Sequence, residues 1–428
     1  MRELSAIVIG GGIGGLTAAA ALRHRGWTVT VLERATALEP VGAGIALAPN
    51  AQRALDTFGA GDAVRAMAGW QAEGGLRLPS GRWLSRTSNE AAAARFGGPV
   101  VVAHRAELVR LLVSLLPEGA VRTGTPAVLT GLGGPGRPAE VTAAGERLTA
   151  GLVVAADGIH SAVRGALFPD HPAPRYAGFT CWRLVVPRPR RPFPAHETWG
   201  RGRIWGTVPL HDGRVYAYAQ ANAPARGHSP DGELNELRRL FGDWHHPVPD
   251  ILAAADPAAV LRNDIHATAA PLPAYHRGRV ALLGDAAHAM TPHLGQGGCQ
   301  AIEDAVVLAH LLDGTDGDVP RALPAYTGAR LPRTLDVVRR SGRIGRLTAL
   351  SSAPACALRT AAVSVLDRLG PAAALRSLDG VADWRPPGRT YAARTEARVA
   401  EARAAEARVA KTRSAETYSA EARSREGQ

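Results

Sequence analysis

Short apolar runs followed by glycine-rich turns recur along the chain and predict its strands. The first lies in "AIVIGGGIGGLTAAAALRHRGWTVTVLER" (6–34), where an alanine-rich segment, a break at Gly26 and a second apolar run ending at Glu33 follow the glycines. β-branched runs bounded by glycine favour buried strands, and the alanine-rich stretch favours a helix. This segment therefore predicts a strand–helix–strand unit.

Two later segments repeat the passage from an apolar strand through a turn to a helix. They are "LVVAADGIHSAVR" (152–164) and "RVALLGDAAHAMTPHLGQGGCQAIEDAVVLAHLL" (279–312). By contrast, "RVYAYAQA" (214–221) alternates in the manner of an antiparallel strand. We therefore predict an α/β protein in which a Rossmann-like domain with a parallel sheet is interleaved with an antiparallel-sheet domain, followed by C-terminal helices.

Composition excludes several classes of function. The net charge is +12, and Lys411 is the only lysine among 50 basic residues. The arginine runs at 187–192 and 330–346 carry no interleaved aromatic residues, which favours a solvated surface over nucleic-acid binding. Three widely spaced cysteines suggest neither a disulfide framework nor a zinc site, and we predict no metal. No apolar run reaches the roughly 18 residues of a membrane span, so we expect a cytoplasmic protein.

The first glycine turn has the spacing of a dinucleotide-binding motif. Gly10, Gly12 and Gly15, with Ile13 and Gly14 between the last two, occupy the G-x-G-x-x-G positions directly after a strand. Glu33 follows Gly12 by 21 residues, where a carboxylate can accept hydrogen bonds from a ribose. FAD and NAD both carry such an ADP group, so the motif alone does not separate them.

Together the three strand–turn–helix segments resemble the fingerprints of the single-component, FAD-dependent aromatic hydroxylases, the group A flavoprotein monooxygenases. The likeness spans residues 4–385, and the salicylate hydroxylase and zeaxanthin epoxidase type is the most similar. "YAGFTCWRLVV" (176–186), "WGRGRIWGTVPLHDGRVYAYA" (199–219) and "ADWRPP" (382–387) look like segments of that type.

The resemblance implies FAD as cofactor and NADPH or NADH as reductant. Oxygen would add at the flavin C4a, and the hydroperoxide would hydroxylate or epoxidise a small aromatic or olefinic substrate. Nucleic acid is not an expected partner, and a monomer or homodimer is expected. The cofactor-binding residues that the resemblance implies outside the first glycine turn are Glu33, Arg34, Arg105, Asp157, Gly158, Gly284 and Asp285.

The glycines of "HLGQGGCQ" (293–300) precede a helix, whose amino terminus presents free N–H groups and the positive end of its dipole. Gly295, Gly297 and Gly298 would let that backbone approach the flavin without a Cβ in the way. Pro292 would stiffen the loop where oxygen reacts. Cys299 is interpreted as a small buried residue rather than a nucleophile.

The substrate pocket is less well defined by sequence. Its candidates lie in segments expected to face the flavin, although strand alternation directs half of such side chains away. They are Arg183, Trp199, Trp205, His211 and Tyr216, and of these Arg183, His211 and Tyr216 are candidate catalytic residues together with Pro292. Two alternatives stay open. One is a halogenase-like enzyme or flavoprotein reductase, although halogenases usually need a pocket lysine, and the other is a non-catalytic FAD-binding protein.

The motifs also predict how the domains divide the chain. The FAD-binding domain is assigned to 1–70, 100–170 and 270–330, and the substrate domain to 71–99 and 171–269. C-terminal helices at 331–385 are expected to pack on the core. A charged tail at 386–428, with glutamate and arginine at five-residue spacing, is expected to be helical or disordered.

Overall fold

The computed structural model describes residues 4–38, 43–68, 73–313, 318–368 and 375–388. Met1–Trp384 form one compact unit, and Arg385–Gln428 form a second. Only residues 385–388 of the second unit are described, so the predicted tail lies almost entirely outside the described residues.

A six-stranded, mainly parallel sheet forms the first layer of the compact unit. Its strand order is β17-β18-β11-β1-β2-β7, and only β17 runs antiparallel to its neighbour. Central β1 pairs Val8 with Val31 of β2 and with Val154 of β11, so three segments distant in sequence share one register. The strands are β1 Ser5–Ile9, β2 Thr28–Leu32, β7 Val121–Arg122, β11 Leu152–Ala155, β17 His276–Arg277 and β18 Val280–Leu282.

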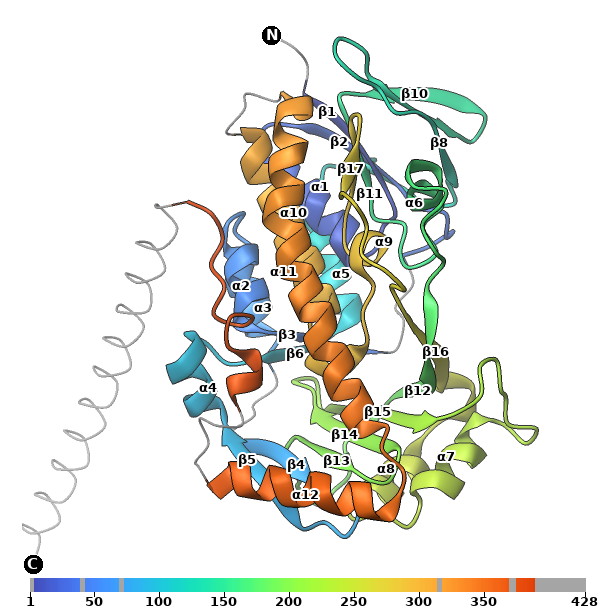
Figure 1. Cartoon of the computed structure of the whole chain (residues 1–428), viewed down its shortest axis with the longest axis vertical. Coiled ribbons are helices and arrows are strands. Elements are labelled where there is room, and N and C mark those ends of the chain that lie inside the picture. Colours follow the sequence, from blue (N-terminus) through green and yellow to red (C-terminus); the bar gives the residue numbers. More distant parts are fainter. Residues whose placement is uncertain (1–3, 39–42, 69–72, 314–317, 369–374, 389–428) are drawn as a thin grey trace, which may run out of the picture. The chain divides into compact units, whose positions relative to one another are not determined.

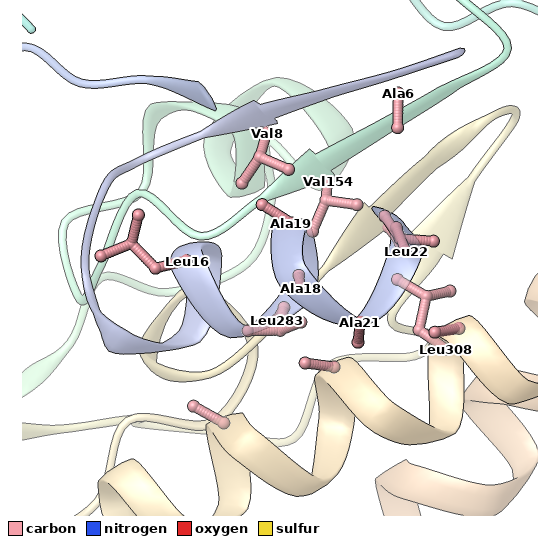
Figure 2. Packing of buried hydrophobic residues seen from close by; sticks show 14 of the residues in the cluster. Ala6, Val8, Leu16, Ala18, Ala19, Ala21, Leu22, Val154, Leu283 and Leu308 are labelled. Carbon is pink, nitrogen blue, oxygen red and sulfur yellow. The ribbon is translucent and has the colours of Figure 1, made fainter. Parts of the chain in front are cut away.

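The predicted alanine-rich helix is α1, Ile13–His24, and it packs between this sheet and α10, Gly297–Asp313. Figure 2 shows Ala18, Ala19 and Leu22 of α1 among side chains of the sheet and of α10. Alanine allows close approach on both sides, and the labelled side chains are almost fully buried. This packing fixes the glycine turn before α1 relative to the start of α10.

A seven-stranded sheet forms the second layer, in the order β16-β12-β15-β14-β13-β4-β5. Residues 73–88 join residues 175–267 in this sheet, because β4 pairs in parallel with β13. The strands are β4 Glu73–Arg77, β5 Trp83–Ser88, β12 Arg175–Pro187, β13 His196–Trp199, β14 Arg203–Pro209, β15 Arg214–Asn222 and β16 Leu261–Ala267.

The two faces of the seven-stranded sheet differ. Trp182, Leu184 and Trp205 point to one face and are buried with α7 (Glu233–Phe241) and α8 (Val248–Ala254) in an apolar cluster. Alternation along each strand sends the residues between them to the opposite face. That opposite face carries the polar side chains described below.

Further helices and strands surround these sheets. Two small antiparallel sheets consist of β3 Gly44–Leu47 with β6 Val101–His104, and of β8 Ala127–Gly131, β9 Ala139–Ala143 and β10 Glu146–Ala150. The helices are α2 Pro49–Asp56, α3 Gly61–Ala66, α4 Asn89–Phe96, α5 Arg105–Ser114, α6 Ala162–Leu167 and α9 Asp285–His288, with 3-10 turns η1 Pro257–Ala259, η2 Pro292–Leu294 and η3 Arg376–Leu378. None of the helices in the described part of the chain could span a membrane.

Two C-terminal helices complete the unit, α11 (Val319–Thr348) and α12 (Ala353–Arg368). In Figure 1 the long α11 runs beside α10 and reaches the seven-stranded sheet. The predicted boundary at residue 330 falls inside α11, because Pro324 and Pro332 are accommodated within this helix instead of ending it. The predicted fold class, a parallel sheet interleaved with an antiparallel sheet and followed by helices, is confirmed. The assignment of segments to two domains remains a proposal.

Candidate functional site

A cavity of about 500 Å³ lies between the carboxyl ends of the parallel strands and the polar face of the seven-stranded sheet. Ligands bind at such strand ends in open α/β sheets. The predicted residues that line the cavity are Gly12, Ile13, Gly14, Arg105, Gly158, Arg183, Tyr216, Gly284, Asp285, Pro292, Gly295, Gly297 and Gly298. One cavity thus joins all three predicted fingerprints to the substrate segment.

The glycines of the first turn leave its backbone without side chains, at positions where a Cβ would clash or would face open space. A Cβ on Gly10, which has φ +108°, would lie 2.4 Å from the Ala156 carbonyl oxygen. A Cβ on Gly15 would lie 2.0 Å from the Gly10 carbonyl oxygen, and one on Gly14 would lie 2.7 Å from Leu283. A Cβ on Gly12 would contact no protein atom within 4 Å, so the backbone there faces open space at the amino end of α1.

Glu33 lies where β2 ends, beside the glycine turn. Its carboxylate accepts hydrogen bonds from the backbone N–H of Gly11 at 2.5 Å and of Ala35 at 2.8 Å. Arg34 is exposed. Gly12 lines the cavity, whereas Gly10, Glu33 and Arg34 do not. The Glu33 carboxylate is therefore beside the turn but outside the cavity lining.

Arg105 and Asp285 bring opposite charges to the cavity wall. The protein around the cavity lowers the pKa of the Arg105 guanidinium by desolvation, while Asp285 acts in the opposite direction. Desolvation likewise raises the pKa of Asp285, against the effects of His288 and Arg105. Both side chains are accessible from the cavity, so they can hold a polar ligand there.

Asp157 and Gly158 follow β11 at the same edge of the sheet. Asp157 Oδ2 accepts a hydrogen bond from the Val163 N–H at 3.2 Å, and its Oδ1 is buried without a partner. Gly158 has φ +80° and lines the cavity. The unpaired carboxylate oxygen is a free acceptor at the end of a strand.

The second glycine loop ends at the amino terminus of α10. Gly295 has φ +62° and closes the turn after Pro292, and a Cβ on Gly298 would lie 2.9 Å from Ile45 Cδ1. Gln296 is buried and its Nε2 has no hydrogen-bond partner. Free backbone N–H groups and this amide therefore present donors to the cavity.

Cys299 directly follows Gly298 and is fully buried, as predicted. Its Sγ donates to the carbonyl oxygens of Ala46 at 3.4 Å and Gly295 at 3.5 Å. Burial raises the pKa of this thiol to about 12, so a thiolate is not available near neutral pH.

A buried ionic network supports α10 from behind. Arg330 donates to Glu303 and to Asp304, each at 2.6 Å, and Asp304 also accepts from His288 Nε2 at 2.6 Å and from the Gly284 N–H at 3.0 Å. Burial opposes ionisation of Asp304, but His288 and Arg330 outweigh it and lower its pKa to about 2. The prediction that the 330–346 run is a solvated surface is wrong for Arg330, which is 1% exposed, because these carboxylates hold it inside.

One wall of the cavity comes from alternate residues of four neighbouring strands, polar ones from β12, β15 and β13 and the apolar Ile204 from β14. Arg183 and Tyr216 lie on it, as predicted. Sequence reasoning missed the other side chains of this wall and of the loop beside it, Cys181, Glu197, Tyr218, Gln220 and His293. The signal that could have found Glu197 is the alternation of "HETW" (196–199), which places it on the same face as Trp199.

Three predicted pocket residues lie elsewhere. Trp205 is fully buried on the opposite face of the sheet, because its strand alternates at that position. Trp199 lies at the edge of the polar wall, where its Nε1 donates to Glu197, and it does not line the cavity. His211 lies in the turn between β14 and β15, 3.8 Å from Glu107, outside the cavity lining.

A family model described as an FAD binding domain matches residues 3–341. The chain belongs to this FAD-binding family. It is 40% identical over 360 residues to the aurachin C monooxygenase/isomerase of Stigmatella aurantiaca, across 83% of this chain and 92% of the relative. It is 36% identical to the 3-amino-4-hydroxybenzoate 2-monooxygenase of Streptomyces cremeus, across 83% and 90%.

A solved structure extends the likeness to three dimensions. The crystal structure of Klebsiella pneumoniae HpxO with FAD and uric acid superposes with a TM-score of 0.80 and 30% identity, across 89% of this chain and 96% of that one. The predicted resemblance to FAD-dependent aromatic hydroxylases is thereby confirmed, and so is FAD as the cofactor. The protein is a flavin monooxygenase of the aromatic hydroxylase type.

The residues of the cavity fit FAD. The open backbone at Gly12 leaves room for a pyrophosphate at the start of α1, and the unpaired Gln296 amide and the α10 N–H groups can donate to the acceptor edge of a flavin. Arg105 and Asp285 line the same cavity. The remaining polar wall is then free to contact a substrate.

Proposed function

We propose that this FAD-dependent protein uses NADPH or NADH and O2 to hydroxylate a small aromatic substrate held against the polar wall. The observation that carries this proposal is the single cavity of about 500 Å³, which joins the bare glycine turns to Arg183, Tyr216 and Tyr218. A volume of this size matches a small-molecule site.

The backbone positions the cofactor. Gly10, Gly12, Ile13, Gly14 and Gly15 would hold the pyrophosphate, Glu33 the adenosine ribose, with Arg34 beside it, and Arg105, Asp157, Gly158, Gly284 and Asp285 the middle of the molecule. Gly295, Gly297 and Gly298 would bring N–H groups to the flavin, with Pro292 stiffening the loop. Bound FAD supplies the transfer of electrons from the nicotinamide cofactor and the activation of O2.

The protein's own contribution to the substrate is binding, orientation and exclusion of water. Desolvation raises the pKa of Tyr216, so this residue stays a neutral phenol that donates and accepts hydrogen bonds near neutral pH. The guanidinium of Arg183 offers several N–H donors, one of which binds Asn263 Oδ1 at 2.7 Å. These two side chains would orient the ring.

The relatives support the proposed class of substrate. The named substrates 3-amino-4-hydroxybenzoate and uric acid are small, planar and rich in polar groups. The proposal includes a cytoplasmic location, where nicotinamide cofactors are at hand, and a monomer or homodimer as the active form.

The test is the anaerobic rate of FAD reduction by NADPH and by NADH, alone and with aromatic acids, phenols and N-heteroaromatic compounds. We expect one nicotinamide cofactor to reduce the flavin and one class of aromatic compound to accelerate this reduction at least tenfold. Protein that holds FAD but is reduced by neither cofactor under any of these conditions would instead be a flavoprotein served by a partner, or a non-catalytic one.

A further inference from the structure

A carboxylate without a cation lies on the wall of the cavity. Glu197 Oε2 accepts a hydrogen bond from Tyr218 Oη at 2.6 Å, and Oε1 accepts from Trp199 Nε1. Within the described part of the chain no arginine or histidine forms an ion pair with Glu197. Each carboxylate oxygen can accept a further hydrogen bond, and both known donors are neutral.

The strand register places Glu197 in a row with Arg183. Glu197 of β13 pairs with Gly206 of β14, Gly206 with Tyr218 of β15, and Tyr218 with Arg183 of β12. The row therefore begins with a negative group and ends with a positive one. Three interstrand spacings of about 4.8 Å place the backbones of Glu197 and Arg183 about 14 Å apart. Both side chains line the cavity.

Gly206 allows the middle of this row to form. A Cβ at Gly206 would lie 2.0 Å from Tyr218 Cζ, so the tyrosine ring lies directly over the glycine. This placement brings the Tyr218 hydroxyl to Glu197. Desolvation and then Glu197 raise the pKa of Tyr218 well above its usual value, so the hydroxyl remains a donor.

Both ends of the row act on the same buried thiol. Burial raises the pKa of Cys181 to about 12, and Arg183 lowers it while Glu197 raises it. Cys181 therefore lies within the electrostatic range of both Arg183 and Glu197. Desolvation also raises the pKa of Glu197, against the hydrogen bonds from Tyr218 and Trp199, so a further donor would stabilise its ionised form.

We propose that Glu197 is a specificity-determining residue that accepts a hydrogen bond from an N–H or O–H group of an aromatic acid whose carboxylate pairs with Arg183. The substrate class is thus an amino- or hydroxy-substituted aromatic carboxylic acid. This inference rests on the proposed function, because it assigns the polar wall to the substrate.

The test compares two probes of nearly equal shape, 3-aminobenzoate and 3-methylbenzoate, which differ in the presence of an N–H donor. Binding to the oxidised FAD-loaded protein is followed by the perturbation of the flavin absorption spectrum. We expect the wild type to bind 3-aminobenzoate at least fivefold more tightly. Glu197→Gln, which removes the charge at constant size, should reduce this preference to less than twofold.

Tyr218→Phe is the matched control. It removes the hydroxyl that binds Glu197 but leaves the carboxylate, so the preference for 3-aminobenzoate should persist. FAD content and thermal unfolding of both variants report whether the fold is intact. Equal loss of the preference in both variants would show that the pair only supports the sheet, and would overturn the inference.

A wild type that binds neither probe, or binds both equally, would also overturn it. Binding needs no nicotinamide cofactor and no O2, so the outcome is separate from that of the proposed function. A preference for 3-aminobenzoate in a protein whose flavin no nicotinamide cofactor reduces would contradict the proposed reaction and support the assignment of Glu197.

Discussion

The glycines of the proposed FAD site lack a Cβ for two different reasons. At Gly15 the protein itself leaves no room, because a Cβ would lie 2.0 Å from the Gly10 carbonyl oxygen. At Gly12 the protein leaves open space, where we propose that the pyrophosphate of FAD binds. The sequence motif treats these glycines alike, whereas the structure separates folding from binding.

Gly12→Ala should therefore weaken FAD binding at least tenfold, while the unfolding free energy of the FAD-free protein changes by less than about 0.5 kcal/mol. Gly15→Ala should lower both the FAD affinity and the unfolding free energy, because its Cβ would clash with the backbone of Gly10. The measurements are FAD retention after dialysis and denaturant unfolding of the FAD-free proteins. Full FAD affinity in Gly12→Ala would place the pyrophosphate elsewhere.

His293 provides a pH-dependent test at the residue scale. Its ring packs edge-on against Phe179 at 5.2 Å, and neither ring nitrogen has a hydrogen-bond partner. Burial lowers the pKa of His293 from its usual 6.5 to about 4. The folded state therefore disfavours the protonated ring, and the protein loses stability as the pH falls from about 6.5 towards 4.

Between about pH 7.5 and pH 5, the unfolding free energy of the wild type should fall by about 2 kcal/mol more than that of His293→Gln. Denaturant unfolding at the two pH values measures the difference. His24→Gln, at an exposed side chain in the last turn of α1, is the matched control and should follow the wild type. Equal pH dependence of wild type and His293→Gln would contradict the burial of this ring.

At the scale of elements, two of the three glycines of α11 have opposite surroundings. A Cβ on Gly342 would contact no protein atom within 4 Å, whereas one on Gly345 would lie 2.8 Å from His293 Cε1. The helix thus supports the loop that contains Pro292 and His293, with Gly345 packed against the His293 ring.

Gly342→Ala should raise the unfolding free energy by up to about 1 kcal/mol, because alanine favours the helix. Gly345→Ala gains the same propensity but should lower stability by about 1–2 kcal/mol, because the His293 ring is confined by Phe179. Denaturant unfolding of both variants measures the difference. Stabilisation by Gly345→Ala would mean that α11 does not confine the loop.

Local patterns predicted what local chemistry determines. The turn at Gly10 to Gly15 and the loop at Pro292 to Gly298 each precede a helix, so the spacing of their glycines can be recognised in the sequence. The contacts that confine these glycines come from distant segments, at Ala156, Leu283 and Ile45, and no local pattern specifies them. Glu197 and Tyr218 meet only because two pairings through Gly206 align them, and no pattern within either strand specifies that register. Arg330 likewise looked like a surface residue, since its partners Glu303 and Asp304 lie on another helix.

At the scale of the whole molecule, function depends on two sheets built from interleaved segments. The parallel sheet takes strands from residues 5–32, 121–122, 152–155 and 276–282, and the antiparallel sheet takes its strands from the segments between them. Continuous apolar runs before glycine-rich turns predicted the parallel sheet, and alternating runs predicted the antiparallel sheet. The parallel pairing of β4 with β13, which joins residues 73–88 to the substrate wall, links positions more than a hundred residues apart, and hydrophobic periodicity does not encode it.

The central claim is that this cavity brings an activated oxygen and an aromatic ring together. The most direct test is mass spectrometry of the aromatic product formed under heavy-isotope O2 with the reducing nicotinamide cofactor, using 3-amino-4-hydroxybenzoate and 3-aminobenzoate as probes. We predict a product that contains one heavy oxygen atom from O2. Oxidation of the nicotinamide cofactor that yields only hydrogen peroxide, with no labelled product from either probe, would contradict this account.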